Sequence, residues 1–492
     1  MSSSDQLTQS LIKKKTVSLS PVQKGVSFGL NGLFFAAHVV ANGKLLSALG
    51  EGGDSASAIV SSTQSVIVGG TLGLLLGTGL KFSFFVGKGE SDRQNAQEVL
   101  QSAIYLSQIL GLVAASALWS SGPILKAIYD REAAEIAADF FKAYAAGAFF
   151  LMYLIVIPQF AISVNRPMVP PLVMLSVLLI SLGASYLLGF QASLGATGIG
   201  LGGVIGSGVT ALFSRIWFSQ KEFSVYRQDD WRVNGFKTWV KELLSLGWKL
   251  SLQRLTEWGN LAAIATIIGA QSRTELAAFN PSSLYIVLFG TTQQGIGAAT
   301  GMMIKQLIGM KTQKENAGDN IDQFYRKFKA PIVKAILTGV SFNLLFCIAA
   351  YVFPDRLVQP FLADQTDSST RNLSKILLQY HSLGMLADSA SIVGSGALRG
   401  WDALIFPIVV RTALMTLGIA VSFGLFETGE ATTALSLSYS RDLAIAVSIP
   451  FILARIYQKI EDEKSTHSRQ AGAFHQPSPV EKEDQQHTLK NP

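Results

Sequence analysis

Two carboxylates lie deep inside apolar stretches of this chain, Glu257 within 240–270 and Asp388 within 371–397. A charge at the centre of a membrane helix costs about 2.5–3.5 kcal/mol on insertion scales, so such residues usually serve a function. A carboxyl group removed from water favours its neutral form, and it can take up a proton from one side of a membrane and release it on the other. The same negative charge would attract a cationic substrate.

The neighbours of these carboxylates allow a second interpretation. Arg254 precedes Glu257 by three residues and shares its helix face, so the two could form a structural ion pair that holds Glu257 ionised. Asp388 precedes Ser389 and could instead brace a helix contact. If both carboxylates belong to one network, we expect Arg254 and Asn260 to join them, and the pair to titrate as a coupled unit.

Further candidates lie on other apolar stretches. His38 has apolar neighbours and is either a packed histidine or a proton carrier, whereas Asn42 cannot titrate, which leaves ion coupling to the second half of the chain. Trp258, Tyr285 and Phe289 could line a cavity for flat organic cations through cation–π contacts, or they could face lipid.

The elements that position these residues are membrane helices. The chain is 49% hydrophobic and only 15% charged, which is more apolar surface than a soluble core of 492 residues needs. A spanning helix needs about 20 predominantly apolar residues. That criterion predicts an all-α polytopic membrane protein with twelve transmembrane helices, at about 22–46, 57–86, 95–119, 136–162, 168–190, 197–219, 240–270, 276–308, 327–353, 371–397, 402–425 and 434–458.

The second six stretches repeat the glycine pattern of the first. The residues Gly73, Gly79 and Gly87 correspond to Gly295, Gly301 and Gly309 with a constant offset of 222. The alignment of Leu49-Gly50 with Ile268-Gly269 places His38 opposite Glu257, and Asn165-Arg166-Pro167 with Pro171 matches Arg399-Gly400-Trp401-Asp402 with Pro407. Parallel repeats predict two six-helix lobes related by a pseudo-twofold axis along the membrane normal, with a central cavity whose two ends open in turn.

Basic residues set the expected orientation. Twenty Lys and Arg fall in the loops on the side of the N-terminus and five in the opposite loops, so both termini are expected in the cytoplasm. The Lys13-Lys14-Lys15 run precedes a full-length span without a cleavage pattern, so no cleaved signal is expected. The expected organisation is an N-terminal segment 1–21, a lobe 22–220, a linker 221–239, a lobe 240–460 and a disordered tail 461–492.

Several classes of protein are excluded. The lone Cys347 rules out an intramolecular disulfide, and five scattered histidines lack metal-ligand spacing. The net charge is +7, but the basic residues cluster in short loops, where they set the orientation of the chain in the membrane. The charge therefore implies no nucleic-acid partner. No nucleophile–base pair, phosphate loop or nucleotide motif occurs, so we expect no enzyme and no cofactor beyond a coupling ion, H+ or Na+.

The chain over about 22–458 resembles the multidrug and toxic compound extrusion (MATE) family. The motifs that carry the resemblance are Glu257-Trp258, Leu276-Ala-Ala-Phe, Gly295 through Gly301 to Leu307-Ile-Gly309, and Gly396-Ala-Leu-Arg-Gly400 with Pro407. The resemblance implies an ion-coupled exporter in which Glu257 and Asp388 act. Three residues depart from the family pattern. Arg254 is not part of it, Asn42 stands where some bacterial members have a coupling aspartate, and Ala262 stands where animal members often have a second glutamate.

Three functions are therefore considered. The first is a secondary active exporter of small organic compounds, cationic in the multidrug manner, in exchange for protons or sodium. The second is a flippase for a lipid-linked precursor. Such a flippase would line its cavity with several cations, and only Arg254 and Lys249 lie deep in the apolar stretches, which counts against it. The third is a non-transporting receptor-like relative, which would be expected to lose its intramembrane carboxylates. We expect a monomer in the plasma membrane, or in the inner membrane of a bacterium.

The expected orientation is testable by accessibility. Single cysteines placed in the 221–237 and 311–326 loops, in a Cys347→Ser background, should react with an impermeant maleimide only from the cytoplasmic side. A cysteine at Glu51 should react only from the other side. Labelling of the two basic loops from outside would reverse the assigned orientation.

Overall fold

The computed structural model describes residues 21–50, 52–129, 131–218, 226, 235–316, 326–362, 367–427 and 433–474, and these residues form helices without a β-strand. A first group of long helices contains α2 (Pro21–Ser47), α3 (Gly53–Lys88), α4 (Arg93–Trp119), α6 (Arg131–Ser163), α7 (Val169–Tyr186) and α8 (Gly195–Phe218). A second group contains α10 (Phe236–Gln271), α11 (Arg273–Asn316), α12 (Arg326–Val352), α14 (Ser368–Gly400), α15 (Ile405–Glu427) and α16 (Thr433–Phe474).

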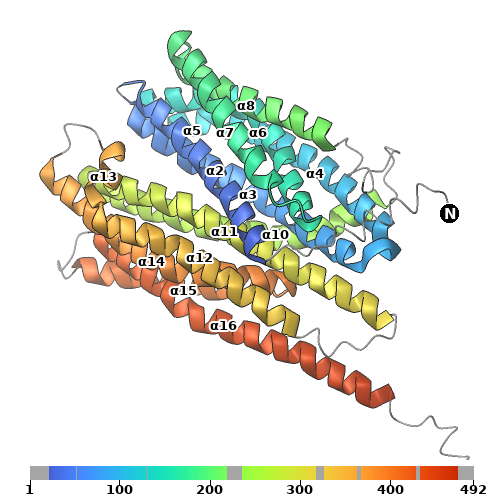
Figure 1. The fold of residues 1–492 in the computed structure, drawn as a ribbon. Coiled ribbons are helices and arrows are strands. Elements are labelled where there is room, and N and C mark those ends of the chain that lie inside the picture. The colour runs from blue at the N-terminus through green and yellow to red at the C-terminus, as the bar shows by residue number, and fades with distance from the viewer. Residues whose placement is uncertain are drawn as a thin grey trace, which may run out of the picture.

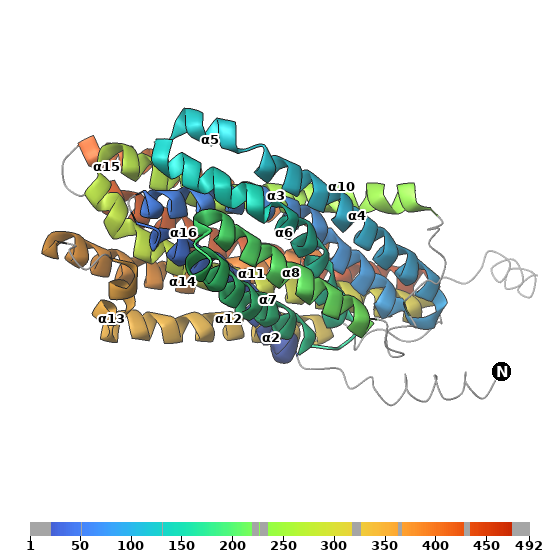
Figure 2. The ribbon, with the colours of Figure 1, turned by 90° about the horizontal axis from the view of Figure 1, so that it is seen from above.

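Short helices occur between the long ones. They are η1 (Gly89–Asp92), α5 (Gly122–Ile128), η2 (Leu187–Gln191), α13 (Pro354–Val358) and η4 (Gln359–Phe361). The blue-to-green first group and the yellow-to-red second group occupy separate halves of the molecule (Figure 1). The long helices run side by side along one general direction (Figure 2).

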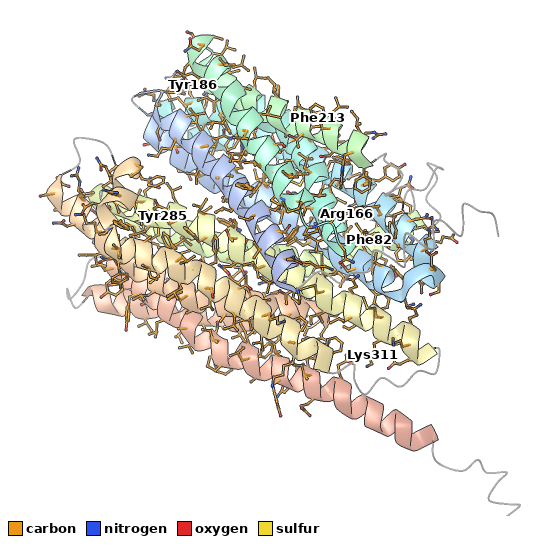
Figure 3. The ribbon with its side chains drawn as sticks, viewed as in Figure 1. Phe82, Arg166, Tyr186, Phe213, Tyr285 and Lys311 are labelled. Atoms are coloured by element: carbon orange, nitrogen blue, oxygen red, sulfur yellow. The ribbon has the colours of Figure 1, made fainter. Side chains whose placement is uncertain are left out.

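The outer surface is apolar, as a bilayer requires. Eight described segments are long and apolar enough to cross a membrane, and α3 and α4 fall within one of them, Ser55–Trp119. The helices α10, α11 and α14 are outside this set because polar and charged side chains interrupt their apolar stretches. Large side chains such as Leu112, Phe213 and Leu345 are more than half exposed. Phe213 projects from the outer side of α8 (Figure 3). The chain is therefore an integral membrane protein whose polar side chains gather in particular helices.

Several helix and segment boundaries differ from those expected from the sequence. Helix α10 begins at Phe236, inside the expected linker, and α16 continues to Phe474, into the segment that we expected to be disordered from 461. Residues 1–20 and 475–492 and most of the linker lie outside the described residues. Three basic residues expected in loops are buried instead: Lys24 donates a hydrogen bond to Gln306 Oε1 at 3.2 Å, Lys311 donates to Glu463 Oε2 at 2.6 Å, and Arg399 lies in the last turn of α14.

Helix packing in the two groups follows one scheme. In the first group α6 packs against α3, α4 and α8, and in the second α14 packs against α11, α12 and α16. Between the groups, α3 packs against α10 while α11 packs against α2, and α3 and α11 pack against each other. Each contact of one group thus has a counterpart in the other.

The matched glycines lie at matched helix crossings. A Cβ atom on Gly73 would clash with the backbone of Ser251 in α10, and one on Gly295 would clash with the Phe28 carbonyl in α2. The pair at the α3–α11 crossing is reciprocal, since Gly87 meets the backbone of Gln306 and Gly309 meets the backbone of α3 at Phe84. Glycine is required at these positions because the two helix backbones approach too closely for any side chain.

The turns after α6 and α14 are also alike. Arg166 N donates to Ala161 O at 2.8 Å, and Ala403 N donates to Leu398 O at 3.0 Å. A left-handed residue stands two positions past the end of each helix, Asn165 with φ 61° and Asp402 with φ 58°. The similarity of Asn165-Arg166-Pro167 to the segment after Arg399 therefore has a geometric basis, a shared helix-ending turn.

The glycine crossings predict a contrast within α11. Gly295→Ala should lower the free energy of unfolding by about 1–3 kcal/mol, because the methyl group forces α11 away from α2. Gly290→Ala on the same helix has open space around its Cβ and should change stability by less than about 1 kcal/mol. Denaturant titration of the detergent-solubilised protein measures both, and equal effects would contradict the close approach at Gly295.

Candidate functional site

A cavity of about 100 Å³ lies between the two helix groups. The helices α2, α3, α6 and α7 of the first group and α10 and α11 of the second contribute to its wall. Most of the wall is apolar and includes Phe35, Leu72, Leu76, Ile155, Met174 and Trp258. A site at the junction of two repeats, mostly apolar with a few polar groups, is the usual form of a ligand pocket.

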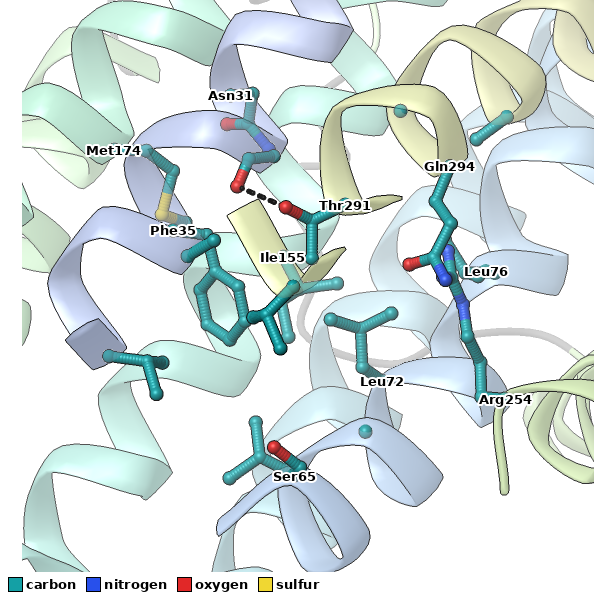
Figure 4. Close-up of a pocket in the computed structure, with 18 of the residues that line it drawn as sticks. Asn31, Phe35, Ser65, Leu72, Leu76, Ile155, Met174, Arg254, Thr291 and Gln294 are labelled. Carbon is teal, nitrogen blue, oxygen red and sulfur yellow. Dashed lines mark hydrogen bonds between the residues drawn. The ribbon is translucent and has the colours of Figure 1, made fainter. Parts of the chain in front are cut away.

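Arg254 is the only charged residue among the described residues that line this cavity. It comes from α10, and Gln294 comes from the neighbouring α11. The ends of these two side chains meet on one side of the cavity, with Phe35 and Ile155 on the other (Figure 4). The Arg254 residue is only 5% exposed, so the cavity has a positive charge in its wall that water hardly reaches.

Glu257 lies behind this wall, one turn further along α10 than Arg254. Gln253 Nε2 donates to Glu257 Oε1 at 2.9 Å, and Gln294 Nε2 donates to Glu257 Oε2 at 2.8 Å. Arg254 Nη1 is 3.8 Å from Oε2, and Arg411 Nη1 of α15 is 4.0 Å from Oε1. Glu257 therefore faces the interior of the second helix group and reaches the cavity only through Gln294 and Arg254.

Asp388 of α14 shares a partner with Glu257. Arg411 Nη2 donates to Asp388 Oδ1 at 2.8 Å, and the same guanidinium donates from Nη1 to Ser391 Oγ at 3.2 Å. Arg411 thus joins the two carboxylates into one cluster, the bridge that we had expected from Arg254 and Asn260. Asn260 does not serve as the bridge: its buried Oδ1 has no hydrogen-bond partner among the described residues.

The cluster extends further into the second group. Arg441 Nη2 is 3.9 Å from Asp388 Oδ2, and Arg441 Nη1 donates to Asp442 Oδ1 at 2.6 Å. The Nδ1 atom of the buried His381 is 3.1 Å from Asp442 Oδ2. Arg399 Nε donates to Gln253 Oε1 at 3.2 Å, which ties the end of α14 to α10.

The charges in this connected cluster do not balance. Its four arginines are Arg254, Arg399, Arg411 and Arg441, and its three carboxylates are Glu257, Asp388 and Asp442. With His381 neutral, the described part of the cluster carries one excess positive charge. Taking charges out of water is tolerated when each has an opposite partner, so the excess is the chemically informative feature.

The candidates of the first helix group lie apart from this cluster. His38 and Asn42 are both buried on α2, and His38 Nε2 is 3.3 Å from Asn42 Nδ2. Neither belongs to the described wall of the cavity, although Val39 between them does. The structure gives His38 the surroundings of a packed histidine, with one amide neighbour one turn away.

The aromatic candidates divide. Trp258 lines the cavity, whereas Tyr285 and Phe289 do not, because their face of α11 turns toward α12 and α13. The Phe289 ring stacks on Phe346 with centroids 4.1 Å apart, and the Tyr285 hydroxyl donates to Leu357 O at 3.1 Å. Of the two roles considered for Tyr285 and Phe289, neither describes this structure: both belong to an aromatic core between α11 and α12.

The sequence analysis missed Arg411 and Arg441 as deep cations. Both lie inside predicted spans, 402–425 and 434–458, and the insertion cost that drew attention to Glu257 applies equally to them. The estimate that only Arg254 and Lys249 are deep was too low. The two arginines are tolerated because Asp388 and Asp442 lie within ion-pair distance of them.

The helical architecture, the apolar exterior and the enclosed polar cluster are those of a polytopic membrane protein, and comparisons with known proteins show what it is similar to. The MatE family model matches residues 39–187. A Synechococcus protein described as "Probable multidrug resistance protein NorM" is 26% identical over 291 residues, 56% of this chain and 59% of its own length. A Bradyrhizobium diazoefficiens protein of the same description is 24% identical over 72% of this chain and 75% of its own.

A solved structure shares the fold. It is a MOP superfamily transporter from Pyrococcus furiosus, for which reverse polarity of the binding pocket suggests a different function. It superposes with a TM-score of 0.76 at 18% identity and covers 89% of this chain and 95% of its own. Over residues 39–187 the chain is similar to the multidrug and toxic compound extrusion family, which confirms the resemblance expected from its motifs. The alignment with the Synechococcus relative spans less than two thirds of that protein.

The bridge through Arg411 is testable by a double-mutant cycle. Arg411→Gln leaves Asp388 buried without its hydrogen-bonded partner and should cost about 3–5 kcal/mol of unfolding free energy. Combining it with Asp388→Asn should cost less than the sum of the single changes, by about 1–3 kcal/mol. The exposed pair Lys375 and Asp355 provides a control cycle, with an expected coupling below about 1 kcal/mol. Additive effects at Arg411 and Asp388 would contradict the bridge.

Proposed function

We propose that this protein is a secondary active exporter of small organic compounds, driven by inward movement of protons or sodium. The observation that carries the proposal is the cavity between two helix groups of matching contacts, with an ionisable cluster directly behind its wall. Such a cavity can open to one side and then to the other if the groups rock against each other. The names of the bacterial relatives, multidrug resistance proteins, support export as the direction.

In this proposal all twelve long helices span the bilayer as two six-helix lobes with both termini in the cytoplasm. The charged cluster comes from α10, α14, α15 and α16 and is enclosed where these helices face one another, while α15 and α16 also carry long apolar stretches that can face lipid. Each polar side chain can then remain inside the protein while lipid meets apolar surface. The paired contacts of α3 with α10 and of α11 with α2 support a twofold relation between the lobes.

Glu257 is the proposed coupling residue. Its two oxygens accept hydrogen bonds from Gln253 and Gln294, and Gln294 is itself part of the cavity wall. Protonation would remove the negative charge that faces Arg254 and Arg411, so the positive charge felt in the cavity would rise. A bound substrate and the proton would then change each other's affinity by the same factor, so the occupancy of the cavity and the protonation of Glu257 would be linked.

The two alternatives fit the site less well. A flippase for a lipid-linked pyrophosphate would line its cavity with several cations, and although four arginines are buried nearby, the described wall of the cavity contains Arg254 alone. A receptor-like relative without transport would have no need for intramembrane carboxylates, yet Glu257 and Asp388 are present and held in a defined geometry. Export accounts for both observations.

Replacing Glu257 by glutamine should abolish gradient-driven transport while leaving folded protein at a similar level. Glutamine keeps the size of the side chain and removes the titrating group, so protonation is separated from packing. The measurement is movement of a panel of fluorescent organic anions and cations in inverted membrane vesicles, under an imposed pH gradient or an imposed sodium gradient.

The control is Asp355→Asn, which removes a carboxylate from the surface pair with Lys375 and should leave transport unchanged. Gradient-driven transport by the Glu257→Gln protein at the rate of the unaltered protein would show that the glutamate is structural. Absence of transport by the unaltered protein under either gradient, across the whole panel, would remove the exporter proposal.

A further inference from the structure

The two intramembrane carboxylates led us to expect cationic substrates, but the structure compensates both of them. Asp388 accepts a hydrogen bond from Arg411 at 2.8 Å, and Glu257 lies between Arg254 and Arg411 and outside the described cavity wall. A substrate in the cavity therefore meets Arg254 before it meets either carboxylate. The polarity of the wall is the reverse of that expected from the sequence.

Arg254 has unused hydrogen-bonding capacity. Its Nε and Nη1 atoms are buried and have no hydrogen-bond partner among the described residues. The nearest carboxylate oxygen, Glu257 Oε2, is 3.8 Å from Nη1, too far for a hydrogen bond, and it already accepts from Gln294. A buried guanidinium with unpaired N–H groups is costly, and an anion that accepts from it in the cavity removes that cost.

We propose that the cavity of the exporter proposed above binds an amphipathic organic anion. Its carboxylate, sulfonate or phosphate group pairs with Arg254, and its apolar body lies against Phe35 and Ile155 on the opposite wall (Figure 4). The planar fork of arginine suits two oxygens of such a group. This inference rests on the exporter proposal for its biological direction, but the binding site itself does not depend on transport.

Other polar groups of the wall can bind an organic anion that also carries uncharged N–H or O–H groups. The amide oxygens of Asn31 and Gln64 are buried without a hydrogen-bond partner among the described residues, so each can accept from an N–H or O–H group on the body of the ligand. A cation could contact the Trp258 ring, but it would have to approach the excess positive charge of the cluster without an exposed carboxylate to offset it. The wall therefore selects by charge and tolerates variation in the apolar body.

The test uses three probes that share one aromatic skeleton: 2-naphthalenesulfonate, 2-naphthyltrimethylammonium and the uncharged 2-naphthalenemethanol. Their binding to the purified full-length protein in detergent is measured by calorimetry without any ion gradient. The unaltered protein should bind the sulfonate at least tenfold more tightly than the other two. Equal or tighter binding of the ammonium probe, or no binding of the sulfonate, would overturn the proposal, and neither result depends on a variant.

Arg254→Gln should weaken sulfonate binding by about tenfold or more, the usual effect of losing a charge-assisted hydrogen bond, without weakening the ammonium probe. Arg254→Lys should keep the preference for the anion because the charge remains. Arg215→Gln, which removes an arginine from an exposed position on α8, is the matched control and should change nothing. Unchanged sulfonate affinity in a folded Arg254→Gln protein would overturn the proposal.

The two proposals can fail separately. Selective anion binding without gradient-driven transport would keep the binding site and remove the exporter. Gradient-driven transport of the ammonium probe, with anion binding that does not depend on Arg254, would keep the exporter and remove the anion site.

Discussion

The burial of four arginines with three carboxylates inside one helix group is the constraint on which the rest of this structure depends. Each of these charges loses its hydration when the helices pack, and mutual attraction offsets that loss only in a closely fitted arrangement. Arg411 illustrates the requirement. Its guanidinium group, on α15, contacts Asp388 and Ser391 on α14 and Glu257 on α10. The relative positions of these three helices are therefore set by ion pairs as well as by apolar packing.

The first helix group is built differently. Its cores are apolar, and its contribution to the cavity is apolar and amide side chains, with Gln159 accepting from Gly79 N at 2.9 Å and Gln64 donating to Tyr144. The repeat thus keeps the backbone contacts of the two halves alike while the side chains diverge. His38 and Glu257 illustrate this divergence: they correspond in the repeat, but only Glu257 has a network of ionised partners.

The sequence predicted the long helices well and singled out the closely packed glycines, because both depend on features with few alternatives. Long apolar stretches fix the helices, and the glycines at 73, 87, 295 and 309 stand where backbones cross too closely for side chains. Helix ends were predicted less well, since α10 starts inside the expected linker and α16 runs past 461. Whether a helix continues into water depends on local propensity and tertiary contacts such as that of Lys311 with Glu463, which hydropathy does not register.

The polarity of the site was the part that the sequence concealed. Glu257 and Asp388 are visible as charges in apolar stretches, but their effect depends on which partners face them, and Arg411 lies more than 150 residues from Glu257 along the chain. Both carboxylates are paired, and the charge left for a ligand in the proposed anion site is Arg254, whose Nε and Nη1 atoms have no hydrogen-bond partner among the described residues. In this proposal Glu257 acts on the cavity indirectly: in its ionised form it offsets part of the charge of Arg254, and in its protonated form it leaves that charge to the ligand. An anion would bind more tightly when Glu257 is protonated. Coupling of this sign favours movement of the anion and the proton in the same direction, so inward proton movement can drive export of an anion only if the anion leaves the outward-open cavity before the proton binds and the protonated form returns without it.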